Sequence, residues 1–119
     1  MIALRISALV LGASMCSVAL ADSTYRLKGC AQFEDGVSLG FVGTRGEVRR
    51  MYLWPKGVRL GGDVKGYAKL SQVKEFELRP VLRITYTSGT SVSFGPIDSS
   101  CQQLLRRVGA PLVHIRDDG

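Results

Sequence analysis

Apolar and polar side chains alternate with a period of two in several stretches of this chain, a pattern typical of strands with one buried face. Residues 25–33 and 37–41 alternate on either side of Asp35-Gly36, a pair that favours a tight hairpin turn. A third strand is expected over residues 47–54, after a turn at 43–46. These segments predict an antiparallel hairpin that is extended by one further strand.

The alternation in the first of these strands leaves the orientation of one cysteine open. Tyr25, Leu27 and Phe33 would share a face of the sheet. Cys30 would then point to the other side, unless a β-bulge at Gly29 resets the alternation.

The middle of the chain carries weaker signals. Residues 58–60 form a short extended piece, and the glycines between 61 and 66 make this part the least ordered by composition. Residues 67–78 fit either a helix or a strand. A strand over 72–78 is favoured, and Pro80 prevents it from continuing.

The last third of the chain has the clearest strand pattern. Residues 82–87 and 91–94 are rich in β-branched and aromatic side chains, which suit a pleated sheet. The turn at 88–90 contains glycine, so these two strands predict a second hairpin. Residues 112–115 are expected to form a final edge strand.

Residues 98–108 predict a short helix with both ends marked. Asp98 can accept hydrogen bonds from the free amides of the first turn. Gly109 can take the left-handed conformation that ends a helix, and Pro111 follows. The apolar side chains have helical spacing and form one stripe: Cys101, Leu104, Leu105 and Val108. The predicted fold class is α+β, a small antiparallel β-meander of about six or seven strands with one C-terminal helix packed on it.

Residues 1–21 are interpreted as a cleavable signal peptide. Arg5 provides the positive start, an apolar run follows, and Ala19-Leu20-Ala21 has the form of a cleavage site. The mature chain would begin at Asp22, and residues 22–119 would be a single exported domain, periplasmic or secreted.

Two alternatives to cleavage at this site are disfavoured. The apolar run of about 15 residues is shorter than the roughly 20 that a spanning helix needs. A lipoprotein would be cut before Cys16, but Met15 stands where that processing requires a small residue.

Cys30 and Cys101 remain in the exported domain, and they predict one disulfide in an oxidising compartment. Such a bond would close a loop of about 70 residues and stabilise the fold by roughly 4 kcal/mol. The alternative is two separately buried thiols. No metal site is expected, because His114 is the only histidine and the cysteines lack ligand spacing.

The net charge favours an anionic partner. It is +6 for the whole chain and +5 after residues 1–21 are removed, since Arg5 is the only charged residue among them. A basic exported protein is attracted to acidic proteins or to the anionic envelope. Nucleic acid is not expected as a partner, because export and the lack of a nucleic-acid-binding motif argue against it.

No motif predicts an enzyme or a cofactor. His114 has no Ser-His-Asp or Cys-His context. Glu75 and Glu77 share a face of their strand, but with basic neighbours they are expected to form a solvated, ion-paired surface. The glycines of residues 57–66 lack phosphate-loop spacing.

One basic and aromatic cluster is the candidate binding site. Its members are Arg45, Arg49, Arg50, Tyr52, Trp54, Lys56 and Arg59. Arg50, Tyr52 and Trp54 would share a face of a strand, and these residue types are enriched in interface hot spots. The competing interpretation places Trp54 in the core, with the arginines shielding an edge strand.

The predicted function is that of an exported, non-enzymatic binding protein. In size, compartment and disulfide content the chain is similar in outline to periplasmic lysozyme inhibitors and to immunity proteins, whose recognition motifs it lacks. That likeness implies an inhibitor or immunity-type protein that docks on an acidic protein partner. The alternative is an envelope accessory protein that binds anionic lipid or glycan, touching the membrane only peripherally.

Overall fold

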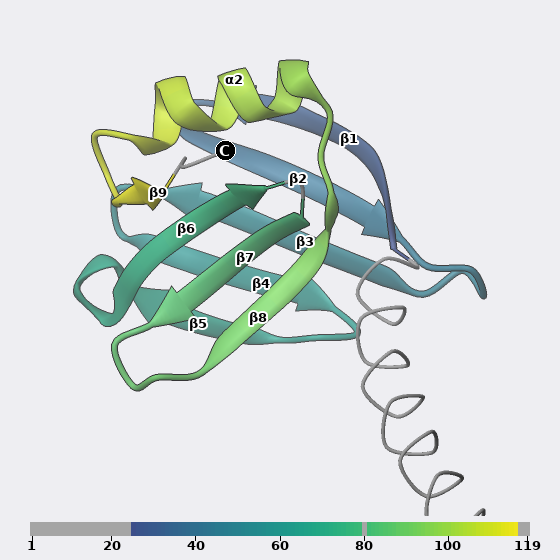
Figure 1. Ribbon diagram of the computed structural model, residues 1–119, viewed down its shortest axis with the longest axis horizontal. Helices are drawn as coiled ribbons and strands as arrows, with labels where there is room; N and C mark the ends of the chain where they lie inside the picture. The colour runs from purple at the N-terminus through teal and green to yellow at the C-terminus, as the bar shows by residue number, and fades with distance from the viewer. Residues whose placement is uncertain (1–24, 80, 117–119) are drawn as a thin grey trace, which may run out of the picture.

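The computed structural model describes residues 25–79 and 81–116, and the predicted signal peptide and cleavage site lie outside them (Figure 1). The first sheet has the strand order β1-β2-β3-β4-β5. Its strands are β1 (Arg26–Phe33), β2 (Gly36–Val42), β3 (Val48–Trp54), β4 (Gly57–Gly62) and β5 (Gly66–Lys69). The second sheet has the order β8-β7-β6-β9. Its strands are β6 (Val73–Arg79), β7 (Val81–Tyr86), β8 (Ser91–Pro96) and β9 (Ile115–Arg116).

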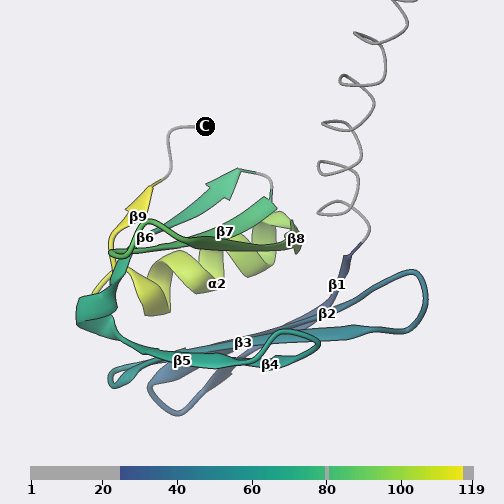
Figure 2. The same ribbon diagram turned by 90° about the horizontal axis from the view of Figure 1, so that it is seen from below.

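The fold class is α+β, as predicted, but the strands do not form one meander. Figure 2 shows the two sheets as separate layers, and Figure 1 shows the helix α2 (Ser99–Gly109) along one side of them, next to β1 and β2. The short helix η1 (Leu70–Gln72) carries the chain from the first sheet to the second. The described part therefore has nine strands rather than six or seven. Two layers form because each sheet has an apolar face that must be buried.

The core lies between the layers and is closed on one side by α2, which packs against β1 and β2. Phe41 of β2 and Phe94 of β8 meet across it, with ring centres 5.6 Å apart. The buried side chains of the first sheet occupy alternate positions, as the period of two predicts: Val37, Leu39, Phe41, Met51, Leu53 and Val58.

A β-bulge decides the orientation of the first cysteine. Leu27 pairs with Phe41, and Gly29 pairs with Gly40, so the register shifts between them. Cys30 is thereby brought onto the inner side of the sheet, and its sulfur bonds to Cys101 of α2 at 2.05 Å. The predicted disulfide is confirmed, and it ties β1 to the helix. A disulfide in a small domain is compatible with an extracytoplasmic location.

The start of α2 was predicted correctly, and its end was not. The backbone N–H of Cys101 donates to Asp98 Oδ1 at 2.8 Å, which is the expected N-cap. Gly109, expected in the left-handed conformation, is instead the last helical residue, and the capping position is Ala110 in the right-handed conformation. Close packing explains this glycine, since a Cβ on it would lie 3.1 Å from Leu53 Cδ2.

The predicted apolar stripe of α2 is only partly buried. Cys101 and Leu105 are buried, whereas Leu104 and Val108 lie half-buried at the edge of the core.

The glycine-rich middle of the chain is more regular than its composition predicted, because it forms β4 and β5. Gly62 has a φ of +90°, and a Cβ there would lie 2.0 Å from the carbonyl oxygen of Val48. Glycine is required at this position so that two backbones can approach. The favoured strand over 72–78 is confirmed as β6.

The expected final edge strand is present, but it is shorter than residues 112–115 and lies later in the chain. Leu112 N–H and Val113 N–H both donate to the carbonyl of Gly109, so the chain turns there. Only Ile115 and Arg116 extend, and they pair in parallel with β6.

Candidate binding face

Strand β3 presents its polar and aromatic residues on the outer face of the first sheet. Met51 and Leu53 are buried, while Arg50, Tyr52 and Trp54 alternate with them and point away from the core. The predicted sharing of one face is confirmed. The interpretation of Trp54 as a core residue is wrong, because Trp54 is half-buried and stacks on Tyr52 outside the core, with ring centres 4.8 Å apart.

Two aromatic residues that the sequence did not single out complete this face. Phe33 of β1 contacts Tyr52 edge-on at 5.6 Å between ring centres, and Tyr67 of β5 lies 5.8 Å from Trp54. Phe33 and Tyr67 are 56% and 53% exposed, the large hydrophobic residues most open to solvent in the described part of the chain. We call the outer surface formed by these residues and two arginines the aromatic face: Phe33, Arg50, Tyr52, Trp54, Arg59 and Tyr67.

Within the described residues, the arginines of the aromatic face have no acidic partner. Arg59 stands opposite Tyr52 in the register, and its Cζ lies 5.7 Å from the centre of the Trp54 ring. Arg50 is two positions away from Tyr52 on β3 and is exposed. Among residues 25–79 and 81–116, no carboxylate forms an ion pair with either arginine. Both cations are therefore free to meet an anion.

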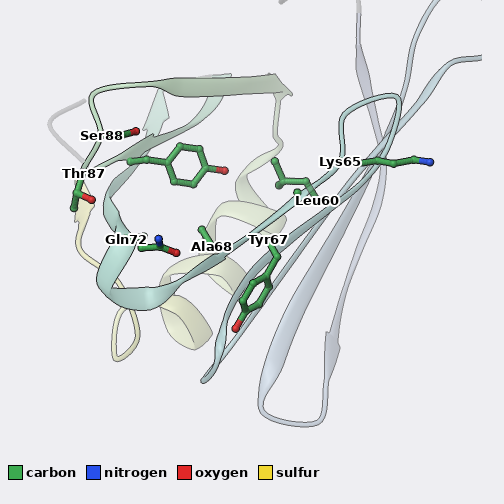
Figure 3. A pocket seen from close by; sticks show the side chains of 9 residues that line it. Leu60, Lys65, Tyr67, Ala68, Gln72, Thr87 and Ser88 are labelled. Carbon is green, nitrogen blue, oxygen red and sulfur yellow. The ribbon is translucent and has the colours of Figure 1, made fainter.

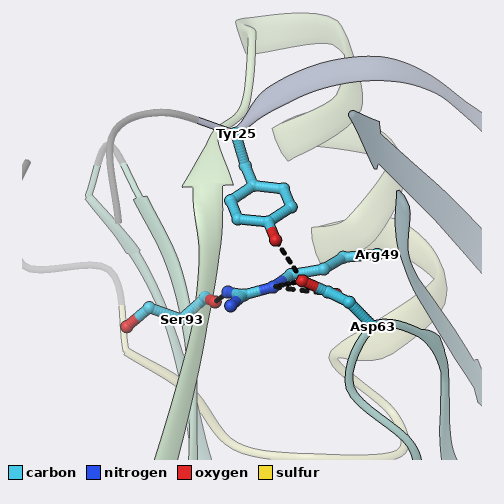
Figure 4. Close-up of polar contacts among 4 residues, drawn as sticks. All are labelled: Tyr25, Arg49, Asp63 and Ser93. Carbon is cyan, nitrogen blue, oxygen red and sulfur yellow. Dashed lines mark hydrogen bonds and ion pairs between the residues drawn. The ribbon is translucent and has the colours of Figure 1, made fainter. Parts of the chain in front are cut away.

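Arg49 leaves the cluster and joins the two sheets. Its Nε lies 3.2 Å from Asp63 Oδ1, and its Nη1 donates to the carbonyl of Ser93 on β8 at 2.6 Å (Figure 4). Its Cζ lies 4.1 Å from the centre of the Tyr25 ring, and the Tyr25 hydroxyl donates to Asp63. This hydrogen bond, with burial, raises the pKa of Tyr25. The four residues form a clasp between the sheets, the Arg49 clasp.

The remaining two cations of the cluster lie in turns. Arg45 is exposed and pairs with Glu47 at 3.8 Å, away from the aromatic face. Lys56 lies in the β3–β4 turn, where its carbonyl accepts a hydrogen bond of 2.8 Å from the Tyr67 hydroxyl. The turn thus holds Tyr67 in place. Of the seven predicted residues, the structure brings together Arg50, Tyr52, Trp54 and Arg59, with Lys56 at the border.

A hollow of about 480 Å³ opens on the aromatic face beside Tyr52 and Phe33. Gly40 and Gly61 line it on either side of Arg50, which pairs with both of them in the sheet. A Cβ at Gly40 would have no atom within 4 Å, and one at Gly61 would meet only Arg50 Cβ at 3.9 Å. The hollow exists because these positions lack side chains.

The acidic β1–β2 turn lies at one border of the aromatic face. The pKa of Tyr52 is raised by partial burial first and then by the negative charges of Glu34 and Asp35. The face is therefore cationic at Arg50 and Arg59 and anionic at this border.

A second cavity, of about 340 Å³, lies on the other side of the first sheet, beneath the β7–β8 turn (Figure 3). Leu60, Ala68 and Tyr86 line it, and Thr87 and Ser88 add hydroxyl groups. Burial raises the pKa of Tyr86. No carboxylate, imidazole or thiol is among its lining residues, and its ionisable side chains are Lys65, Tyr67 and Tyr86.

The other residues considered for catalysis or metal binding are dispersed. Glu75 pairs with Arg116 at 3.5 Å, and His114 is exposed after the last turn. The described residues contain no group of three or more potential metal ligands. Within the same residues, no helix has the length and apolar character needed to cross a membrane.

No family model, curated protein or solved structure matches this chain. The function is therefore argued from the chemistry of the aromatic face itself.

Proposed function

We propose that this protein is a non-enzymatic binding protein that docks its aromatic face on an acidic protein partner. The observation that supports this most strongly is the exposure of Phe33 and Tyr67 beside two arginines that have no acidic partner in the described part of the chain. Large exposed apolar patches bordered by polar residues mark interaction sites on soluble proteins. Tyr, Trp and Arg are the residue types that contribute most to interface hot spots.

Charge supports an acidic partner rather than a neutral one. The exported chain would carry a net charge of +5, with Arg50 and Arg59 central on the aromatic face. Such charges raise the association rate more than the final affinity, while the aromatic rings supply buried area. The protein would act by occluding its partner sterically, as an inhibitor or immunity-type protein does.

The compartment assigned to this function is the periplasm or the extracellular space. The Cys30–Cys101 disulfide favours an oxidising environment. Mass spectrometry of the secreted protein should give Asp22 as its first residue, because Ala19-Leu20-Ala21 is the expected cleavage signal. A product that retains Met1 would contradict this assignment, and one that begins with acylated Cys16 would contradict cleavage after Ala21.

The docking proposal is tested by affinity capture from envelope extract, followed by titration of the captured protein. Arg50→Ala should weaken binding by at least ~2 kcal/mol, as truncation of a hot-spot residue does. Arg45→Ala is the matched control, since Arg45 is an exposed arginine away from the aromatic face. Equal binding by the two variants would contradict docking through this face.

Salt separates the proposed function from its alternative. A docked protein complex should lose association rate at moderate ionic strength and keep much of its affinity, since buried contacts are little screened. Weak binding to anionic lipid or glycan should disappear under the same conditions. Complete loss of the captured protein at moderate salt would favour the envelope accessory protein.

A further inference from the structure

We propose that the hollow beside Tyr52 receives a carboxylate side chain of the partner, carried on an extended segment that crosses the sheet over its glycines. This inference rests on the proposed function, because it assigns the chemistry of the partner at the same aromatic face.

The first argument is the row of residues that forms the floor. Gly29, Gly40, Arg50 and Gly61 are successive partners across β1, β2, β3 and β4. Three of these four positions lack a side chain, so only Arg50 projects from the row; Gly40 and Gly61 line the hollow, and Gly29 lies next to it. Glycine in a strand allows another backbone to approach closely, so an extended chain can lie nearer to the sheet here than over strands that carry side chains.

The second argument is that nothing within the fold requires glycine at the two positions that line the hollow. Gly57 and Gly62 have positive φ angles, and backbone atoms lie within 2.2 Å and 2.0 Å of where a Cβ would be. Gly40 and Gly61 have neither a positive φ nor such a neighbour. Glycine inside a strand costs about 0.5–1 kcal/mol relative to alanine. Gly40 and Gly61 therefore lower the stability of the sheet without any contact in the fold that requires glycine. Room for a docking partner in the hollow would account for glycine at these positions.

The third argument is the charge around the hollow. Arg50 and Arg59 both line it, on adjacent strands and at diagonal positions of the register. Diagonal neighbours lie about 7–8 Å apart, so two long side chains can reach one anion. A carboxylate between them would accept charge-assisted hydrogen bonds and relieve the repulsion of two unpaired cations. Phe33 and Tyr52, on the wall of the hollow, would exclude water and strengthen the attraction.

The fourth argument favours a protein segment over an anionic surface. Glu34 and Asp35 directly follow Phe33 in the β1–β2 turn, so their charges lie close to the same wall, and they raise the pKa of Tyr52. A membrane or polyanion would set negative charge against these two carboxylates. A folded partner can present one carboxylate to Arg50 and Arg59 and neutral side chains to the acidic turn.

The test begins with a random peptide library displayed on phage and selected on the disulfide-bonded protein at physiological salt. The enriched peptides should share an Asp or Glu next to an apolar or aromatic residue. An enriched peptide, made synthetically, should bind at least ~10-fold more weakly when that carboxylate is replaced by its amide, since a charge-assisted hydrogen bond is lost. Peptides enriched without a common acidic residue would overturn the inference.

The deciding variant is Gly40→Val, which fills the hollow with a side chain that suits a strand. It should bind the peptide at least ~10-fold more weakly while its melting temperature stays equal or rises. Gly66→Val is the matched control, because a Cβ at Gly66 also has no atom within 4 Å and Gly66 lies outside the hollow. Gly61→Val replaces Gly40→Val if the first variant does not fold.

The outcomes separate this inference from the proposed function. If Gly40→Val binds the peptide normally and Arg50→Ala binds it more weakly, the assignment of the carboxylate to the hollow is wrong. Docking at the aromatic face would still be supported. Unchanged binding by both variants would contradict both proposals. Binding of phosphatidylglycerol vesicles at the same salt, abolished by Gly40→Val, would show a lipid occupant and overturn the assignment to a protein carboxylate.

Discussion

Arg49 and Arg50 are neighbours in the sequence, but their side chains lie on opposite faces of β3. Arg49 turns towards the second sheet, where it contacts Asp63 and the carbonyl of Ser93. Arg50 is exposed and lines the hollow of the aromatic face. The same substitution at these two positions should therefore have different consequences.

Arg49→Ala should lower the free energy of unfolding by about 1–2 kcal/mol, because it breaks charge-assisted hydrogen bonds that are only partly exposed. Arg50→Ala should change stability by less than ~0.5 kcal/mol, since the side chain is exposed. Urea unfolding of both variants measures the difference. Equal stability of the two would mean that the Arg49 clasp does not hold the sheets together.

Trp54→Ala should cost less stability than truncation of its buried neighbour Leu53. Trp54 is half-buried and contacts only the surface side chains of Tyr52, Tyr67 and Arg59 among the rings and cations of the described residues, which predicts a loss below ~2 kcal/mol. Leu53 is fully buried, so Leu53→Ala should cost about 2–5 kcal/mol. Trp54→Ala should also weaken partner binding by at least ~2 kcal/mol.

The measurements for Trp54 are urea unfolding and titration with the captured partner. The fluorescence of this single tryptophan should in addition be accessible to iodide in the free protein and protected in the complex. If Trp54→Ala is as unstable as Leu53→Ala and the folded variant binds the partner normally, Trp54 contributes to folding and not to binding.

Cys101→Ser should destabilise the fold by about 2–5 kcal/mol, because the disulfide closes a long loop in the unfolded chain. The bonded cysteines are 71 residues apart. Peptide mapping without reductant should find Cys30 linked to Cys101, and thermal unfolding with and without reductant should reproduce the loss in the variant. Alkylatable thiols at Cys30 or Cys101 in the native protein would contradict the pairing.

Tyr25→Phe should reduce the loss of stability at alkaline pH. The hydrogen bond to Asp63 raises the pKa of Tyr25 above its ordinary 10.0, so the folded protein holds this proton more tightly than the unfolded chain. The resulting stabilisation is complete below that ordinary value and is lost as the pH rises through the raised pKa. Urea unfolding of the two proteins between pH 8 and about pH 11 measures the effect. Parallel curves would show that the Tyr25 proton contributes nothing.

Features that depend on neighbouring residues could be predicted from the sequence. Side chains alternate along any strand, so Arg50, Tyr52 and Trp54 had to share a face whichever face it was. Asp98 could be recognised as the start of α2 because capping involves atoms only three residues apart. Cys30 and Cys101 are the only cysteines of residues 22–119, so one disulfide could form between them.

Features that depend on contacts between distant segments could not be predicted in this way. A period of two is satisfied whether Trp54 or Leu53 faces the core, and only the packing of the second sheet decides between them. The bulge before Cys30 reverses the orientation of Phe33, and the pairing of strands brings Phe33 and Tyr67 to the same face as Trp54.

The sequence by itself determined most of the strands, most of the helix, the disulfide and the residues that share the outer face of β3. The tertiary structure decided that the strands form two layers, that Arg49 clasps them, and that glycines from separate strands align beside Arg50. The physical reason is that local patterns reflect the geometry of one strand or helix. Register and layering follow from burying several apolar faces together, which no single segment encodes.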